Sequence, residues 1–418
     1  MPLTDHLDIP RFIPTLRLSL LRQVSALSAD LGCPAYLVGG FVRDALLEKP
    51  VNDFDIVIEG DATKLGRALV QKFGGRVTVH APFKTATWFL GDGEFIDLIS
   101  ARSETYEFPA ALPAIKLGVL ADDLRRRDFT VNALAVRLDG EHFGELSDPL
   151  GGRADLQRGL VRVLHPNSFV DDPTRLFRLV RYAERYGFQI APETEALIPS
   201  ALPYVDKLSP ERLRHELDLL FAEQRAVPML EKLWALGIVQ AVAPALPSDE
   251  ATRGRVQCAL TIPPAVANPV HFRWTVWLLG VSSKEIRVLS KRLHFSADLL
   301  KKVTAASSVF ADLESIAALR PSGCVRRLDG LPEDALWAAA VCAQAEARVK
   351  LEMYLSTWKG LKPVTNGEAL EQMGVPFGPR RGEILWRLRA AWVDGEVGSA
   401  EEECRMLEKM VEEVGSEK

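Results

Sequence analysis

The chain of 418 residues contains no apolar run of about 18 residues, so a typical membrane-spanning helix is not expected. Its five cysteines are scattered and show no CxxC or Cys/His spacing, which indicates neither a disulfide framework nor a zinc site. The first residues, 1–6, lack the basic and apolar segments of a secretory signal. These absences predict a cytoplasmic protein with reduced thiols and no membrane association, and nothing in the sequence implies a protein partner.

An excess of positive charge is also missing. The chain has 51 Lys and Arg against 56 Asp and Glu, a net charge of −5, so any surface that binds nucleic acid must be local. An apolar content of 47% and a charged content of 26% are ordinary for a globular protein. The length predicts two to four domains, each with its own core.

The clearest chemical signal begins with an apolar run, Ala35–Val38, that ends in two glycines. This pattern predicts a short buried strand followed by a turn and by a helix from Phe41 to about Leu47. Glycine lets backbone N–H groups approach a phosphate closely, and an arginine on the helix is a suitable anion donor. Gly39, Gly40 and Arg43 are therefore candidate triphosphate ligands.

Two carboxylates lie on the next predicted strand, Asp53–Ile58. Because side chains alternate along a strand, Asp53 and Asp55 face the same side, where they repel each other unless a cation lies between them. Mg²⁺ is usually held by one or two carboxylates together with substrate phosphates. A solvated strand start is the alternative for this pair taken alone. Asp97, within the predicted strand 94–100, is either a third carboxylate of the metal site or an exposed strand residue.

Three successive arginines, Arg125–Arg127, form the centre of a second motif that extends from Asp123 to Leu134. Such a run is self-repulsive unless an anion is present, and a solvated basic turn is the alternative. Apolar residues after the run would anchor the segment to a core.

Together, these two motifs resemble the nucleotidyltransferase head of the class II (bacterial-type) tRNA nucleotidyltransferase and poly(A) polymerase family. The resemblance implies an α+β fold, in which a polymerase-β-like head with a small mixed sheet precedes an all-α neck, body and tail. It implies Mg²⁺ bound by Asp53 and Asp55, with Asp97 as a further catalytic carboxylate. It also implies that Arg126 and Arg127 bind the phosphates or sugar of the incoming nucleotide.

The same motif contains Asp128 and Asn132, which by this resemblance fix the local geometry of the site. Between the two motifs, residues 101–118 show little periodicity and are expected to form a loop. In the family a flexible loop here helps the site shift between nucleotides, and residues 103–120 are the candidate segment.

A capped helix is predicted within residues 169–188. Asp172 suits an N-cap, Pro173 suits the first helical position, and Gly187 suits the end. Three arginines follow at a spacing of three, near the helix end whose dipole disfavours cations, so an anionic partner is expected. These are Arg175, Arg178 and Arg181. A solvated basic face is the alternative.

By resemblance, Asp171-Asp172-x-x-Arg175 corresponds to the family's EDxxR element, with Asp in place of Glu at the first position. Asp172 and Arg175 would then read the base edge, and Arg178 and Arg181 would face phosphates. A carboxylate can accept from the exocyclic amine of cytosine or adenine, and a guanidinium can donate to the neighbouring ring nitrogen. Uracil and guanine present a carbonyl to the carboxylate, and each such mismatch costs roughly 1–3 kcal/mol.

The predicted domains are a head (1–150), a neck with the base-reading helices (151–225), a helical body (226–330) and a helical tail that binds tRNA (331–418). In the tail, residues 358–362 and 380–389 are candidate contacts to the RNA backbone or merely solvated faces.

The expected function is template-independent nucleotidyl transfer from CTP and/or ATP to the 3′ end of tRNA. Enzymes that add only CC or only A, and poly(A) polymerases, share these motifs and remain alternatives. A non-catalytic RNA-binding scaffold is a rival of a different class. The acidic C-terminal segment, residues 401–413, disfavours poly(A) addition.

Overall fold

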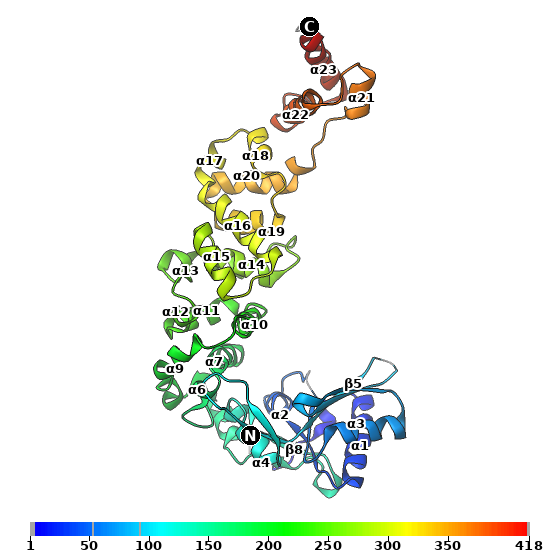
Figure 1. The fold of residues 1–418 in the computed structure, drawn as a ribbon, viewed down its shortest axis with the longest axis vertical. Coiled ribbons are helices and arrows are strands. Elements are labelled where there is room, and N and C mark those ends of the chain that lie inside the picture. Colours follow the sequence, from blue (N-terminus) through cyan, green and yellow to red (C-terminus); the bar gives the residue numbers. More distant parts are fainter. Residues whose placement is uncertain (1–4, 52–53, 92, 416–418) are drawn as a thin grey trace. The chain divides into compact units, whose positions relative to one another are not determined.

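The computed structural model describes residues 5–51, 54–91 and 93–415, with side chains to residue 411. Two compact units follow one another along the chain, Met1–Val242 and Ala243–Lys418. The first contains a mixed sheet with helices and the second is helical (Figure 1). This architecture confirms the predicted α+β head followed by helical regions. None of the helices within the described ranges is both long and apolar enough to cross a membrane.

A seven-stranded mixed sheet with the strand order β3-β4-β5-β2-β1-β8-β9 forms the centre of the head. The strands are β1 (Ala35–Val38), β2 (Asp55–Ile58), β3 (Arg76–His80), β4 (Thr85–Phe89), β5 (Phe95–Ser100), β8 (Ala135–Arg137) and β9 (Leu146–Ser147). Strands β2 and β5 are parallel, and the other neighbouring pairs are antiparallel. All four residues of β1 are buried, which explains why this strand appears in the sequence as an uninterrupted apolar run.

Four helices belong to the head: α1 (Thr15–Asp30), α2 (Gly40–Leu46), α3 (Ala62–Phe73) and α4 (Leu120–Arg125). Helices α1 and α3 pack against each other and against the sheet (Figure 1). Helix α3 begins where the Asp61 side chain accepts hydrogen bonds from the backbone N–H groups of Thr63 and Lys64, and Gly74 is its C-cap. Helix α2 lies within one residue of the bounds predicted from the sequence, Phe41 to about Leu47.

The first described residues pair with the last strand region of the head. The Leu7 N–H donates to the Gly144 carbonyl (2.8 Å), and the Leu146 N–H donates to the Asp5 carbonyl (2.9 Å). His6 forms an isolated antiparallel bridge with Glu145. Segments about 140 residues apart in the sequence therefore close the sheet together.

The prediction of an irregular loop at 101–118 is wrong in part. This region contains the antiparallel strands β6 (Arg102–Thr105) and β7 (Ala114–Leu117), called here the ribbon. Its residues are mostly exposed or half-buried, so no alternation of buried and exposed positions marked it as a strand pair. Between the two strands, the Ala110 N–H donates to the Val170 carbonyl (3.2 Å) and attaches the ribbon to the following helical region.

That helical region completes the first unit. Its helices are α5 (Gly152–Arg158), α6 (Ser168–Asp171), α7 (Thr174–Tyr186), α8 (Pro192–Glu195), α9 (Ile198–Val205), α10 (Pro210–Phe221), α11 (Ala226–Ala235) and α12 (Ile238–Val242), with a small parallel pair β10 (Leu160–Val161) and β11 (Gln189–Ile190). Helix α7 begins at Thr174, one residue later than predicted, and ends before Gly187, which takes a left-handed conformation (φ +69°). Helix α10 begins with Ser209 as N-cap and Pro210 at its first position.

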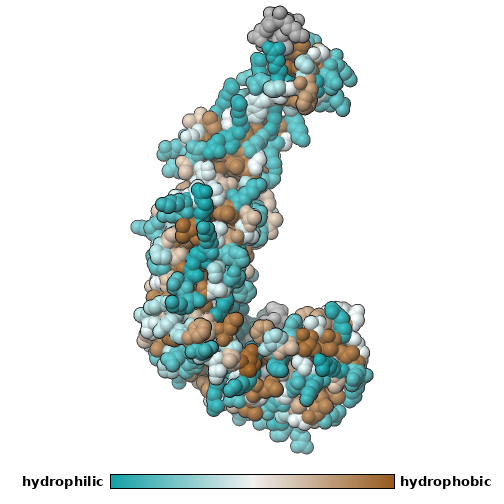
Figure 2. All heavy atoms as spheres, viewed as in Figure 1, coloured by the Kyte–Doolittle hydropathy of each residue, from teal (hydrophilic) through white to brown (hydrophobic). Residues whose placement is uncertain are grey.

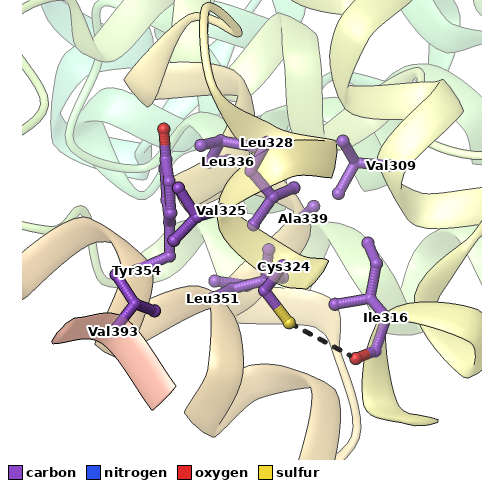
Figure 3. Packing of buried hydrophobic residues seen from close by; sticks show 11 residues of the cluster. Val309, Ile316, Cys324, Val325, Leu328, Leu336, Ala339, Leu351, Tyr354 and Val393 are labelled. Carbon is purple, nitrogen blue, oxygen red and sulfur yellow. Dashed lines mark hydrogen bonds between the residues drawn. The ribbon is translucent and has the colours of Figure 1, made fainter. Parts of the chain in front are cut away.

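The second unit contains α13 (Glu250–Gln257), α14 (Pro269–Trp277), α15 (Ser283–Arg292), α16 (Ala297–Ala311), α17 (Leu313–Ala318), α18 (Pro321–Leu328), α19 (Glu333–Cys342), α20 (Ala345–Ser356), α21 (Gly367–Gln372), α22 (Pro379–Asp394) and α23 (Ala400–Gly415). One of its buried clusters includes Leu328, Leu336 and Tyr354, and the Cys324 thiol there donates to the Ile316 carbonyl (3.7 Å; Figure 3). Hydrophilic residues cover much of its visible face (Figure 2). The units divide at residues 242 and 243, whereas the predicted boundaries at 225 and 330 stay predictions.

Candidate active site

A cleft of about 400 Å³ lies within the first unit. Its walls come from the turn between β1 and α2, from the ribbon, from the second arginine motif and from α7. The predicted site residues that line it are Gly39, Gly40, Arg43, Asp55, Arg126, Arg127, Asp128, Asn132, Asp172, Arg175 and Arg178. The fold therefore brings together motifs that are more than 100 residues apart in the sequence.

The glycine turn depends on close packing against the second motif. Gly39 has φ +64°, a conformation that side chains other than glycine rarely adopt. A Cβ atom on Gly39 would lie 2.5 Å from the Nη1 atom of Arg127. The backbone angle thus favours glycine here, and any other residue would also displace the end of the Arg127 side chain.

Arg43 is buried at the wall of the cleft, with 4% of its surface exposed. Its Nε and Nη2 atoms donate to the two carboxylate oxygens of Asp44 (both 2.9 Å), and its Nη1 atom donates to Asn132 Oδ1 (2.5 Å). Burial alone would lower the pKa of Arg43, but the hydrogen bonds to Asp44 raise it, so the group stays charged. A guanidinium carries five N–H groups, and these three bonds to described residues leave two for a ligand in the cleft.

The carboxylates lie on neighbouring parallel strands. Asp55 at the start of β2 is paired in register with Asp97 on β5, so their side chains project from the same face of the sheet. Asp55 lines the cleft, whereas Asp97 does not and instead accepts a hydrogen bond from Thr87 Oγ1 (2.6 Å). Asp53, predicted to be catalytic and a metal ligand, lies outside the described residues. Within the ranges that are described, no group of three His, Cys, Asp or Glu residues has metal-binding geometry.

The arginine run has an internal counter-charge that sequence reasoning missed. Asp123 on α4 is fully buried and pairs with Arg126 (2.6 Å) and Arg127 (2.8 Å), and Glu104 of the ribbon also pairs with Arg126 (3.1 Å). Burial alone would raise the pKa of Asp123, but the two guanidinium groups outweigh it and lower the pKa. The signal was present, because Asp123 precedes the two arginines by three and four residues, a spacing that makes side chains on a helix neighbours.

Asp128 joins the head to α7. One of its oxygens accepts from the Asn132 Nδ2 atom (2.8 Å) and from the Phe129 N–H (2.9 Å). The other oxygen pairs with Arg178 (2.6 Å). Burial alone would raise the pKa of Asp128, but the charge of Arg178 and the hydrogen bonds lower it.

At the start of α7, the Asp172 carboxylate is held through one oxygen. Its Oδ1 atom accepts from the Thr174 N–H (3.1 Å), from Thr174 Oγ1 (2.6 Å) and from Arg212 Nη2 (2.7 Å). The hydrogen bonds from Thr174 and Arg212 all end on Oδ1, and no described residue donates a hydrogen bond to Oδ2. Arg212 on α10 also donates to the Ala110 carbonyl (3.0 Å), so it connects the ribbon to this carboxylate. Nothing in the sequence pattern pointed to Arg212.

The three arginines of α7 take different positions. Arg175 is 5% exposed and donates to the Arg126 carbonyl (2.8 Å), which places it between the helix and the second motif. Arg178 lines the cleft and pairs with Asp128. Arg181 is not brought to the cleft, because its Nη1 atom donates to Glu216 Oε2 (3.0 Å) in a buried ion pair. Since each residue turns a helix by about 100°, positions 175 and 181 point about 120° apart.

Two segments of the chain match known protein families. Residues 35–162 match the family model described as "Poly A polymerase head domain", and residues 187–249 match one described as "Probable RNA and SrmB- binding site of polymerase A". An A-adding tRNA nucleotidyltransferase from Halalkalibacterium halodurans is 35% identical over 380 residues, which cover 88% of this chain and 86% of that protein. The chain belongs to the tRNA nucleotidyltransferase and poly(A) polymerase family. The resemblance carried by the motifs is thereby confirmed.

Other members of the family are also similar to this chain in sequence or in structure. An A-adding tRNA nucleotidyltransferase from Geobacter sulfurreducens is 34% identical over 423 residues, which cover 96% of this chain but 48% of that protein. The chain therefore spans about half the length of that relative. Similar proteins also include CC-adding and CCA-adding enzymes. A solved structure of the Thermotoga maritima CCA-adding enzyme complexed with tRNA has a TM-score of 0.83 and 27% identity, covering 96% of this chain and 97% of that one.

Proposed function

We propose that this protein is a metal-dependent, template-independent nucleotidyltransferase that adds nucleotides from CTP and ATP to the 3′ end of tRNA. One observation carries the proposal: a single cleft contains a strand-borne carboxylate, three arginines of the head and the Asp172–Arg175 pair. These are the groups needed to neutralise a triphosphate and to recognise a base. The relatives support the substrate, because they are named for adding A, CC or CCA to tRNA.

The carboxylates fit a divalent cation. Asp55 and Asp97 project from one face of two adjacent strands, and neighbouring strands lie about 4.8 Å apart. Oxygen ligands of this kind suit Mg²⁺, and Asp53 is the further predicted ligand. When bound, the ion would neutralise phosphate charge and favour ionisation of the attacking 3′-hydroxyl.

The arginines bind and orient the triphosphate in this proposal. Arg43 directs its two remaining N–H groups to a phosphate, because Asp44 and Asn132 fix the plane of its guanidinium. Arg126 and Arg127 are held by Asp123 in the same wall. Nucleotidyl transfer needs no covalent intermediate, so positioning and charge neutralisation are the main contributions of the chain.

The Asp172 carboxylate, held through its Oδ1 atom, selects cytosine and adenine in this proposal. Since Oδ1 of Asp172 is occupied, Oδ2 is the oxygen that accepts from the exocyclic amine of cytosine or adenine. Arg175 would donate to the adjacent ring nitrogen. Arg178, paired with Asp128, is the α7 arginine available for phosphates, whereas the buried pair with Glu216 gives no support to such a role for Arg181.

Addition of the terminal A alone is the second candidate. It is favoured by two relatives with this name that are 34% and 35% identical to the chain. A tRNA substrate and five cysteines without disulfides also fit a cytoplasmic location, which belongs to the same proposal.

The test supplies tRNA that ends before CCA, after C or after CC, with labelled CTP or ATP. Incorporation of both nucleotides supports CCA addition, incorporation of ATP onto the CC end alone identifies an A-adding enzyme, and long A tails identify a poly(A) polymerase. Failure to incorporate either nucleotide would refute the enzyme and leave a scaffold. Asp55→Asn should abolish incorporation while tRNA binding persists, because Asp55 is proposed to hold the metal ion and is not among the residues proposed to contact RNA.

A further inference from the structure

The last residue of helix α7, Tyr186, does not line the cleft but contacts Arg43, the arginine proposed to bind the triphosphate. The Tyr186 hydroxyl donates to Asp44 Oδ1 (2.9 Å), the same oxygen that accepts from Arg43 Nε. The Arg43 guanidinium carbon lies 4.6 Å from the centroid of the Tyr186 ring. Tyr186 therefore supports Arg43 in two ways, through its hydroxyl and through its ring.

A neighbouring aromatic stack fixes this tyrosine. The rings of Tyr182 and Tyr186 are nearly parallel, with centroids 6.1 Å apart, and Phe129 contacts Tyr182 edge-on at 5.7 Å. Arg43 also lies over Tyr182, at 5.1 Å. The stack thus runs from the second arginine motif of the head to the end of α7, with the guanidinium of Arg43 beside it.

We propose that Tyr186 is a positioning residue for nucleotide binding, which holds Arg43 in the orientation that meets the triphosphate. The inference deepens the proposed function and depends on it. Burial, with the adjacent Asp44 carboxylate, raises the pKa of Tyr186 to about 12, so its hydroxyl remains a donor throughout the neutral range. Without that donor, Asp44 keeps its bidentate pair with Arg43 but loses its attachment to α7.

Helix α7 has the residues proposed to read the base at one end and Tyr186 at the other. Helix α7 has 13 residues and is about 20 Å long. Asp172 and Arg175 are at its start, where the base is read, and Tyr186 is its last residue, where the triphosphate arginine is held. Helix α7 therefore connects the residues proposed to read the base with the residue that contacts Arg43.

Equilibrium binding of ATP and of AMP in Mg²⁺ buffer tests the inference without tRNA. Tyr186→Phe removes only the hydroxyl, so the affinity for ATP should fall roughly three- to tenfold while that for AMP changes less than twofold. Tyr186→Leu removes the aromatic ring as well and should lower the affinity for ATP further. The matched control is Tyr354→Phe, which removes the hydrogen bond from another tyrosine to an aspartate, Asp329 Oδ1 (3.0 Å), in the second unit.

The binding measurements distinguish failure of the positioning role from failure of the proposed function. An unchanged affinity of Tyr186→Phe for ATP would overturn the positioning role. An equal loss of affinity for ATP and for AMP would also overturn it, because a general structural role of Tyr186 would lower both affinities. A loss of the same size in Tyr354→Phe would also overturn it. If the unaltered protein binds no ATP, the proposed function itself fails. If Tyr186→Leu does not fold, Tyr186→Phe alone decides.

Discussion

Exchanging Asp172 for asparagine converts one oxygen of the base-reading carboxylate into a hydrogen-bond donor. Three donors converge on Oδ1 of this residue, two from Thr174 and one from Arg212. An amide nitrogen cannot accept from them, so the asparagine oxygen must occupy the Oδ1 position. Its NH₂ group then replaces Oδ2 and faces the base.

The size of the effect follows from the mismatches. In Asp172→Asn a donor faces the amine of cytosine or adenine, and each such unpaired contact costs about 1–3 kcal/mol, or about 5–150-fold in kcat/KM. The same donor pairs with the carbonyl of uracil or guanine and relieves a mismatch of similar size. The preference for CTP and ATP over UTP and GTP should thus fall at least about 25-fold. Arg175 still opposes the ring N–H of uracil and guanine, so efficient use of these bases is not expected.

The assay measures kcat/KM for the four nucleoside triphosphates on tRNA substrates that end before CCA and after CC. The matched control is Asp61→Asn at the start of α3, where Oδ1 accepts from the Thr63 N–H (2.9 Å) and from Thr63 Oγ1 (2.6 Å). This repeats the Asp172–Thr174 geometry away from the cleft and should leave the preference intact. An Asp172→Asn variant with the wild-type preference would refute base reading by Asp172. A preference altered equally in Asp61→Asn would mean that helix capping explains the effect.

Further predictions concern stability, measured by hydrogen exchange in each unit. Asp128→Asn leaves Arg178 without its carboxylate and should cost the first unit about 2 kcal/mol, less than a fully buried pair because Arg178 is 32% exposed. Because Arg178 lowers the pKa of Asp128 against the effect of burial, this stabilisation is complete above the unfolded value of about 3.9 and is lost as the pH falls through the folded pKa. Wild type and variant should therefore converge in acid, and a constant difference would contradict the reasoning. Leu328→Ala in the cluster of Figure 3 should cost the second unit about 2–5 kcal/mol, whereas Val288→Ala, 57% exposed on α15, should cost less than about 0.5 kcal/mol; equal losses would contradict the core assignment.

Local signals made much of the first unit predictable. The apolar run of β1, the Asp61 cap of α3 and the Gly187 end of α7 each act within a few residues, so the sequence alone indicates them. The cleft was predictable for a different reason. Its glycines, carboxylates and arginines form motifs whose chemistry is specific, although the distances between them come only from the fold.

What escaped prediction depends on partners distant in the sequence. Arg212 and Tyr186 are ordinary helix residues until the fold places them against Asp172 and Asp44. The ribbon is held by backbone hydrogen bonds between half-buried strands, which leave no hydrophobic period. Arg181 shared the spacing of its neighbours, yet the rotation of the helix directed it to Glu216.

The pairing of residues 5–7 with residues 144–146 has a consequence for synthesis of the protein. At about 5–20 residues per second, a ribosome needs roughly 7–30 s to make the intervening stretch. Strand β8 begins about 97 residues after β1 ends, so for roughly 5–20 s of synthesis β1, which is buried on both faces in the finished sheet, lacks β8 as a neighbour. An uncovered strand edge of this kind is a template for aggregation. We expect the nascent head to expose this strand edge until β8 has been made.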